Sequence, residues 1–275
     1  MRRAPLPPWA AGIIGTAALL GLWWLGAATF LRGIGAPADG GPGAIPTPWQ
    51  VLVQLQADGW GFYWRNASVT LAEAGAGYLW GNALALVLAF GVLLVPRLER
   101  LATQLAVVSY CLPVVAVGPV IFIVLGPPRS GEPSGTAVAL AALSVFFTTM
   151  VSALAGLKAA DSSSLDIVTV FGGRRIHQLQ KVRIIAALPA ILAALKIAAP
   201  AALLGAILGE YVGGVDRGLG PAMVNAQQTL EVARVWGTAF ACTALAGAAY
   251  AVLGLVSRVA APWATGSSAA RTGGL

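Results

Sequence analysis

The chain has 275 residues, of which 58% are hydrophobic and only 10% are Asp, Glu, Lys or Arg. Soluble domains carry about 25% charged and about 45–50% apolar residues, and the mean hydropathy of +0.80 also lies on the apolar side. This composition excludes a soluble enzyme, a disordered chain and a nucleic-acid module. The net charge of +7 instead fits a membrane protein, because basic cytoplasmic loops hold the orientation of such proteins.

Six apolar runs are long enough to cross a bilayer, whose hydrocarbon core requires about 20 residues of helix. The first run is longer than the apolar region of a cleavable signal peptide, which is about 7–15 residues, so we interpret it as a retained helix. We therefore predict an all-α integral membrane protein with six transmembrane helices, at roughly 10–31, 69–95, 104–125, 136–157, 188–212 and 235–260.

The first loop is rich in Gly and Pro and leads into a further helix. Thr47 is a good N-cap residue, and Pro48 suits the first helical position. Aromatic residues typical of a membrane–water interface follow, namely Trp49, Trp60, Tyr63 and Trp64. The expected domains are an N-terminal transmembrane helix (1–32), a periplasmic or extracellular loop with a short interfacial helix (33–67), a transmembrane core (68–262) with a cytoplasmic loop (158–187), and a cytoplasmic tail (263–275).

Lys and Arg are distributed unevenly between the two sides of this topology. The termini, the segment after the second run and the loop at 158–187 hold eleven of them, whereas the opposite segments hold five. Because the cytoplasmic side carries the excess, both termini and the loop at 158–187 are expected there. The predicted location is the cytoplasmic (inner) membrane, which the chain crosses several times.

Motifs for nucleotide use and covalent chemistry are absent from the sequence. No Lys follows a Gly, so there is no phosphate-binding G-x-x-x-x-G-K loop, and neither Gly-x-Ser-x-Gly nor His-Glu-x-x-His occurs. We expect a non-catalytic chain without a metal or cofactor that forms a solute pathway and depends on an outside energy source. Ion-coupled carriers tend to hold paired intramembrane charges, whereas only Glu73, Lys196 and Glu210 come near the spans. This favours a partner protein as the energy source and leaves an ion-coupled carrier as the second hypothesis.

The loop at 158–187 is the most informative segment. Ser163 and Asp166 have the spacing of a capping box that starts a helix. Apolar residues at helical spacing are interrupted by Gly172 and Gly173, and basic residues follow, which predicts two short amphipathic helices joined by a glycine corner. One interpretation is a solvated basic loop that only sets topology. The other is a projection that docks on a cytoplasmic partner, with a glycine supplying a backbone turn that other residues disfavour.

This loop resembles that of the permease subunit of binding-protein-dependent ABC importers, in the nitrate, sulfonate and taurine subgroup. The family's loop reads Glu-Ala-Ala, three residues, Gly, nine residues, then Ile-x-Leu-Pro. Asp166 stands at the Glu, Ile167 and Val168 at the Ala pair, and Gly172 at the Gly. The segment 182–185 stands at Ile-x-Leu-Pro with Ile185 in place of Pro, and Leu188-Pro189 keeps the subgroup's second Leu-Pro.

Other segments carry the resemblance over roughly residues 45–262, in the family's order and spacing. They are Ile45-Pro-Thr-Pro-Trp49, Ala67-Ser-Val-Thr-Leu71 with Ala74-Gly75, the prolines Pro113 and Pro119, Gly209-Glu210-Tyr211, and Arg217-Gly-Leu-Gly220. The stretch 127–134 departs from the family, because it is longer than the outward loop usual at that point.

The resemblance implies a type I importer fold and a set of partners. Two permeases, identical in this subgroup, form the pore; two cytoplasmic ATP-binding subunits each receive one loop helix; and a periplasmic or lipid-anchored binding protein delivers the solute. ATP-driven closure of the ATPase pair is then transmitted through the loop to the pore. The residues expected to dock on the ATPase are Asp166, Val168, Phe171, Gly172, Gly173, Arg174 and Arg175.

Candidates for the solute pathway rest on residue type alone, namely Glu73, Tyr110, Pro113, Glu210 and Tyr211. For Glu73 the alternative is a helix-end charge in headgroup water, and for Glu210 it is a cap at the outer end of the fifth span. Aromatic and proline residues in spans are equally compatible with ordinary packing.

The substrate is the least constrained feature. The subgroup moves sulfonates, taurine and nitrate, and it also includes importers of thiamine-precursor pyrimidines, riboflavin and hydantoins. Specificity in such systems lies largely in the binding protein. The first expectation is a small solute such as a sulfonate, taurine or nitrate, with the heterocyclic compounds as the alternative.

Overall fold

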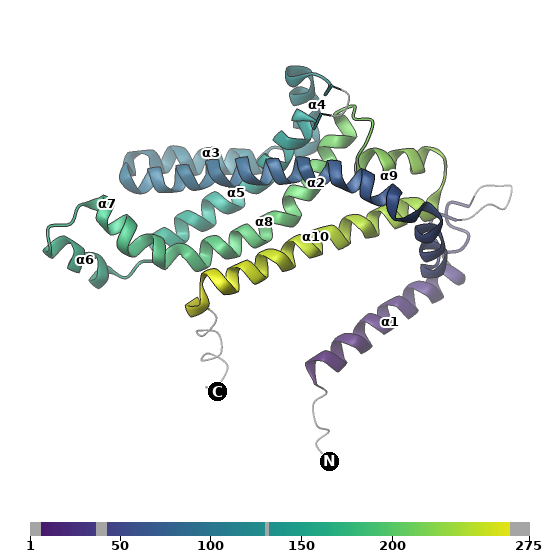
Figure 1. Cartoon of the computed structure of the whole chain (residues 1–275), viewed down its shortest axis with the longest axis horizontal. Coiled ribbons are helices and arrows are strands. Elements are labelled where there is room, and N and C mark those ends of the chain that lie inside the picture. Colours follow the sequence, from purple (N-terminus) through teal and green to yellow (C-terminus); the bar gives the residue numbers. More distant parts are fainter. Residues whose placement is uncertain (1–6, 37–42, 130–131, 265–275) are drawn as a thin grey trace, which may run out of the picture. The chain divides into compact units, whose positions relative to one another are not determined.

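The computed structural model describes residues 7–36, 43–129 and 132–264, and Figure 1 shows their helices. Within these ranges the chain forms helices and loops without a β-strand, as predicted. The helices are α1 (Pro8–Ala28), α2 (Pro48–Leu94), α3 (Glu99–Cys111), α4 (Val114–Leu125), α5 (Gly135–Lys158), α6 (Ser162–Val170), α7 (Arg175–Gln178), α8 (Ile184–Val212), α9 (Leu219–Gln228) and α10 (Val232–Ala260). Short 3₁₀ turns lie at Pro96–Leu98 and Pro262–Ala264, and a π-helical turn at Leu179–Arg183.

Five helices of the described chain are long and apolar enough to span a membrane: α1, α2, α5, α8 together with α7 and the π-helical turn before it, and α10. The count becomes six when α3 and α4 are taken as one broken span. Large apolar side chains such as Ile123 and Val259 face outward from these helices, as lipid-facing positions require. The predicted number of spans is therefore confirmed with one of them interrupted.

The interruption contradicts the expected continuous helix over 104–125. Helices α3 and α4 are bent by 99° at the break, where Leu112 is extended (φ −69°, ψ 124°) and Pro113 is the N-cap of α4. Proline disfavours helical backbone in the residue before it and has no N–H for the helix ladder. The proline therefore ends α3 although both flanking segments are apolar.

The start of α2 follows the capping pattern expected at Thr47. The Thr47 hydroxyl accepts a hydrogen bond from the Gln50 N–H (3.3 Å), and the Gln50 side chain accepts one from the Thr47 N–H (2.8 Å). Pro48 occupies the first helical position. The helix is then broken at Gly59, whose φ of 71° and ψ of 162° lie outside the helical region. The residues of α2 before Gly59 therefore form a separate short helix.

The chain groups into two compact units. The smaller unit comprises Met1–Trp64 and Ala222–Ala241, and the core unit comprises Arg65–Pro221 and Cys242–Leu275. In the smaller unit, the Trp23 ring stacks on Trp236 with 5.4 Å between centroids and contacts Phe240 at 5.5 Å. The Trp236 indole also donates a hydrogen bond to the Ala44 carbonyl (3.2 Å). These aromatic contacts connect α1 and the chain before α2 with the first half of α10.

Small residues line the contact between α5 and α8, which lie side by side in the core unit (Figure 1). A Cβ atom added at Gly205 would lie 2.7 Å from the Leu140 carbonyl and 2.8 Å from the Ala141 Cα. Two glycines of α2 approach α5 in the same way, Gly77 and Gly81. Because lipid provides no hydrophobic drive between helices, close packing of small residues is a main source of helix association in membranes.

Polar side chains inside the core unit find partners on neighbouring helices. The Asn82 amide accepts a hydrogen bond from the Thr149 hydroxyl (2.5 Å) and donates one to the Tyr78 carbonyl (2.7 Å). The Tyr78 hydroxyl donates to the Leu195 carbonyl of α8 (3.1 Å). These bonds fix the rotation of α2 against α5 and α8, since an unsatisfied polar group in an apolar interior is costly.

We expect Gly205→Ala to lower the free energy of unfolding by about 1–3 kcal/mol, the usual cost of overpacking, because the added methyl group would push α5 and α8 apart. The matched control is Gly91→Ala in α2, where an added Cβ meets no atom within 4 Å. That variant should be neutral or gain up to about 1 kcal/mol from helix propensity. Thermal unfolding of the detergent-purified proteins measures both, and equal stability of the two variants would contradict the proposed packing.

Candidate functional site

The glycine corner, residues 161–178, consists of α6, a tight turn and α7. Asp161 caps α6, because its carboxylate accepts a hydrogen bond from the Ser164 N–H (3.2 Å) and its backbone is extended. The predicted capping box at Ser163 and Asp166 is therefore wrong: Asp161 supplies the cap and the helix begins one residue later, so Ser163 already lies in the first turn. The prediction of two short helices joined by glycines is confirmed.

The turn closes α6 with two hydrogen bonds typical of a Schellman motif. The Gly173 N–H donates to the Val168 carbonyl (2.8 Å) and the Gly172 N–H to the Thr169 carbonyl (2.9 Å). Gly172 has a φ of +76°, a conformation that side chains with a Cβ adopt only at a cost. At Gly173 the reason is different, because a Cβ there would lie 2.6 Å from the Val168 carbonyl oxygen.

The tip of the corner exposes apolar surface beside positive charge. Val170 and Phe171 are 83% and 86% exposed, and Arg174 and Arg175 next to them are also exposed. The structure thus gathers the seven residues expected to dock at one corner. Asp166 is exposed on α6, whereas Val168 is half-buried, so its main role in the isolated chain is to support the turn.

Hydrogen bonds make the corner a connected element. The Gln178 amide of α7 donates to the Leu165 carbonyl (3.2 Å) and the Thr169 hydroxyl (2.9 Å) of α6. At the base, the Arg183 guanidinium donates to the Leu157 carbonyl at the end of α5 (3.0 Å). Lys158 at the same end forms an ion pair with Glu99 at the start of α3. Contacts at its base therefore connect the segment before α8 with the end of α5, and the end of α5 with the start of α3.

A second polar site lies at the other end of α8, where Glu210 is only 2% exposed. Its carboxylate accepts hydrogen bonds from the Thr70 hydroxyl (2.5 Å) and the Gly220 N–H (2.6 Å). The Leu219 N–H donates to the Thr70 hydroxyl oxygen (2.9 Å). The carboxylate thus lies at the first turn of α9, where helix N–H groups and the helix dipole favour a negative group.

The glycines of Gly218-Leu219-Gly220 are required by this contact. A Cβ at Gly218 would lie 2.6 Å from the Glu210 carboxyl carbon, and one at Gly220 would lie 2.8 Å from its Cβ. Gly218 also has a φ of +147°, and its N–H donates to the Asn66 side chain (3.3 Å). The motif noted in the sequence is therefore a backbone segment folded closely around one carboxylate.

Glu73 of α2 completes what we name the carboxyl cluster: Asn66, Thr70, Glu73, Ser134, Glu210 and 218–220. Glu73 is fully buried, and one of its oxygens accepts a hydrogen bond from the Ser134 N–H (2.6 Å). Its carboxyl group also lies within hydrogen-bonding reach of Glu210. Glu73 is therefore not a charge in headgroup water. The sequence predicts no pairing between the two glutamates, because no local pattern connects residues so far apart in the chain.

The other pathway candidates lie in α3, at the start of α4 and next to Glu210 in α8. Tyr110 of α3 is exposed and stacks on Phe147 of α5, with 4.4 Å between ring centroids. Pro113 lies at the break between α3 and α4, and Tyr211 is 41% exposed beside Glu210. A cavity of about 480 Å³ lies near the start of the core part of α2, and none of the five candidates lines it. Its lining residues are Ser68, Val69, Ala72, Pro128, Arg129, Glu132, Pro133, Gly214, Val215, Asp216 and Arg217.

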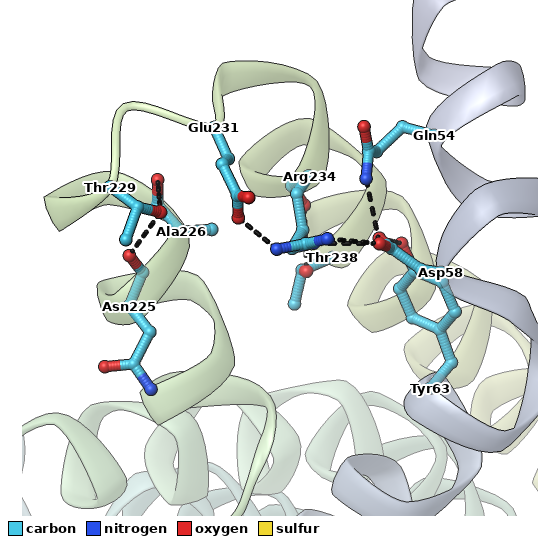
Figure 2. Close-up of polar contacts among 9 residues, drawn as sticks. All are labelled: Gln54, Asp58, Tyr63, Asn225, Ala226, Thr229, Glu231, Arg234 and Thr238. Atoms are coloured by element: carbon cyan, nitrogen blue, oxygen red, sulfur yellow. Dashed lines mark hydrogen bonds and ion pairs between the residues drawn. The ribbon is translucent and has the colours of Figure 1, made fainter.

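An ion-pair network in the smaller unit was not predicted. Figure 2 shows the Arg234 guanidinium between Asp58 and Glu231. It donates two hydrogen bonds to one Asp58 oxygen (2.7 and 2.9 Å), and Gln54 (2.8 Å) and Tyr63 (2.9 Å) donate to the same carboxylate. The Asp58 side chain is 2% exposed and that of Arg234 is 29% exposed. The network joins the first piece of α2 to the start of α10. Gln54 and Asp58 are one helical turn apart, but no pattern indicated Arg234.

The described part of the chain contains no group of three or more His, Cys, Asp or Glu side chains that could hold a metal ion. The polar sites of the core unit are the glycine corner and the carboxyl cluster. Apolar helices of membrane length with buried polar groups between them are the architecture of multi-span membrane proteins, a class that includes transport permeases.

Comparison with known proteins places the chain within this class. Residues 81–265 match the family described as the binding-protein-dependent transport system inner membrane component, and the chain belongs to this family. A probable ABC transporter permease of Haemophilus influenzae is 29% identical over 188 residues, 68% of this chain and 74% of the relative. A formylaminopyrimidine transport permease of Halalkalibacterium halodurans is 24% identical (84% and 90% covered). A putative aliphatic sulfonates transport permease of Bacillus subtilis is 22% identical (83% and 78% covered).

Family membership confirms three predictions from the sequence. The chain is a multi-pass inner-membrane permease of an ABC importer, its fold is the all-helical type I permease fold, and it is not the catalytic subunit. Importers of this family work in general with ATP-binding subunits and a substrate-binding protein.

The burial of Asp58 predicts which partner of the Asp58–Arg234 pair is the more costly to replace. Arg234→Gln should cost about 3–5 kcal/mol, because it leaves a buried carboxylate without its cation. Asp58→Asn should cost less, about 1.5–3 kcal/mol for lost charged hydrogen bonds. The guanidinium of Arg234 is more exposed and would still be hydrated and paired with Glu231. Glu231→Gln is the control at an exposed pair and should cost at most about 1 kcal/mol. Unfolding of the purified variants measures this order, and a larger loss in Asp58→Asn than in Arg234→Gln would contradict it.

Proposed function

We propose that the chain forms the solute pathway of an importer driven by ATP hydrolysis on separate cytoplasmic subunits, and that the glycine corner is its docking element. The observation that carries this proposal is the exposed pair Val170 and Phe171 at the tip of a structured turn. A loop that only sets topology has no need of a Schellman turn that presents a large apolar side chain to water, and exposed apolar patches typically mark interaction sites.

Each docking residue has a distinct role in the proposal. Phe171 enters an apolar groove on the ATP-binding subunit, while Gly172 and Gly173 set the direction in which it points. Arg174 and Arg175 pair with acidic groups at the rim of that groove, and Asp166 faces a basic group there. Val168 supports the turn from inside. Motion of the groove is then passed through Arg183 to α5 and through the turn before α8 to the bundle.

The proposed assembly contains two copies of this permease, two ATP-binding subunits and one extracytoplasmic solute-binding protein in a lipid bilayer. Both termini and residues 158–187 lie on the cytoplasmic side in this arrangement, as the distribution of Lys and Arg supports. The N-terminal helix (1–32), the outer segment (33–67), the core (68–262) and the tail (263–275) remain the proposed divisions.

For the solute we propose a small compound captured by the binding protein, with sulfonates, taurine and nitrate as the first class to test. Support comes from the sulfonate permease relative, which aligns with 83% of this chain. The relative named for a formylaminopyrimidine is similar over 84% of the chain, so the binding protein is the part to screen. Purified binding protein should show a ligand-dependent rise in melting temperature with its cognate compound.

The docking role is tested by Gly172→Val with Gly126→Val as a matched control. Both glycines have a φ of +76°, and an added Cβ meets no atom within 4 Å at either, so the backbone strain of about 1–2 kcal/mol is comparable. Only Gly172 lies at the proposed contact. Capture of the co-expressed ATP-binding subunit and solute uptake, both normalised to permease in the membrane, should fall at least tenfold in Gly172→Val and stay near wild type in Gly126→Val.

Phe171→Ala provides a second variant that leaves the turn intact. It should also weaken capture, because it removes the exposed ring without straining the backbone. Wild-type capture by both corner variants would remove the case for docking at this position.

A further inference from the structure

The carboxyl cluster contains two acidic side chains in contact in the interior of a membrane protein. Glu73 is 0% exposed and Glu210 is 2% exposed. Among the described residues, neither forms an ion pair with a Lys or Arg side chain. The other titratable side chains that interact with Glu210 are Tyr211 of α8 and Cys242 of α10, and neither of them supplies a positive charge. Two neighbouring carboxylates that both carried a full negative charge would repel each other strongly in an interior of low dielectric constant.

Hydrogen bonding assigns different states to the two carboxyl groups. The Gly220 N–H can only donate, so the Glu210 oxygen facing it accepts. The Thr70 oxygen accepts from the Leu219 N–H, and its hydrogen is donated to the second Glu210 oxygen at 2.5 Å, because its other acceptor, the Asn66 carbonyl, is much farther away at 3.4 Å. Glu210 therefore accepts at both oxygens, as an ionised carboxylate does.

Glu73 shows the complementary pattern. Its Oε1 accepts from the Ser134 N–H, whereas its Oε2 is buried and forms no hydrogen bond with the described residues. A proton on Oε2 would give this oxygen a donor within reach of the Glu210 carboxylate. It would also remove the repulsion, as in other buried carboxyl pairs that share one proton.

We propose that Glu73 and Glu210 form a proton-binding site, in which one proton resides on Glu73 Oε2 and is donated to the Glu210 carboxylate. The bound proton connects α2 to α8, and through Ser134 and Gly220 it also secures the starts of α5 and α9. Loss of the proton would leave two adjacent carboxylates and weaken the hold on 218–220. The cluster thus holds the loop between α8 and α9 in place through a bound proton, and this role does not depend on ATPase docking.

The proposed proton-binding site is tested on the purified full-length permease in detergent, without partner subunits. Glu73→Gln keeps an acceptor for Ser134 and a donor for Glu210, so its melting temperature at neutral pH should equal or exceed that of the wild type. Glu210→Gln places an amide among donors and should lower the melting temperature clearly. Asp166→Asn, at an exposed acid, is the isosteric control and should leave it unchanged.

Infrared difference spectroscopy independently detects whether the Glu73 carboxyl group is protonated. At neutral pH the wild type should show the carbonyl band of a protonated carboxylic acid, which shifts in D₂O and is absent in Glu73→Gln but present in Asp166→Asn. The proposal is overturned if Glu73→Gln removes no such band, or if Glu73→Gln destabilises the protein as much as Glu210→Gln. A melting temperature that rises with sodium concentration in the wild type alone, without the acid band, would assign the site to a monovalent cation instead.

Discussion

Polar groups in the interior of a membrane bundle have no water to pair with, and this constraint shapes the core unit. Asn82 and Thr149 satisfy each other between α2 and α5, and the Glu210 carboxylate receives both a hydroxyl and a backbone N–H. The constraint also explains the glycines at 218 and 220, because only residues without a side chain let the backbone approach Glu210 so closely. Helix positions in the core are thus specified by paired polar groups as well as by packing.

Close packing then makes the bundle able to transmit motion. Glycines at the α5–α8 contact bring the two backbones together, so neither helix can shift without the other. At the base of the glycine corner, Arg183 bonds to the Leu157 carbonyl at the end of α5, and Lys158 of α5 pairs with Glu99 of α3. In the proposed assembly, a force applied at Phe171 would reach α5 and α8 through these contacts.

Features with a local sequence signal were predicted, and features that depend on tertiary contacts were not. Apolar length located the spans, Thr47-Pro48 marked the start of α2, and Gly172 was recognised as a turn residue from its place between two amphipathic stretches. Pro113 was noted, yet the span around it was expected to be continuous, because hydropathy does not report the bend that the proline causes. The pairing of Glu73 with Glu210, and of Asp58 with Arg234, requires distant segments to meet, and neither leaves a periodic pattern in the chain.

The central claim is that Phe171 at the glycine corner contacts the ATP-binding subunit. A photo-reactive phenylalanine derivative at position 171, in the permease co-expressed with that subunit, tests this contact directly. The control carries the same group at Ile123 of α4, which is comparably exposed (81% against 86%). The account predicts a covalent product with the ATP-binding subunit from position 171 and none from position 123. Absence of that product from position 171, with and without ATP, would contradict it.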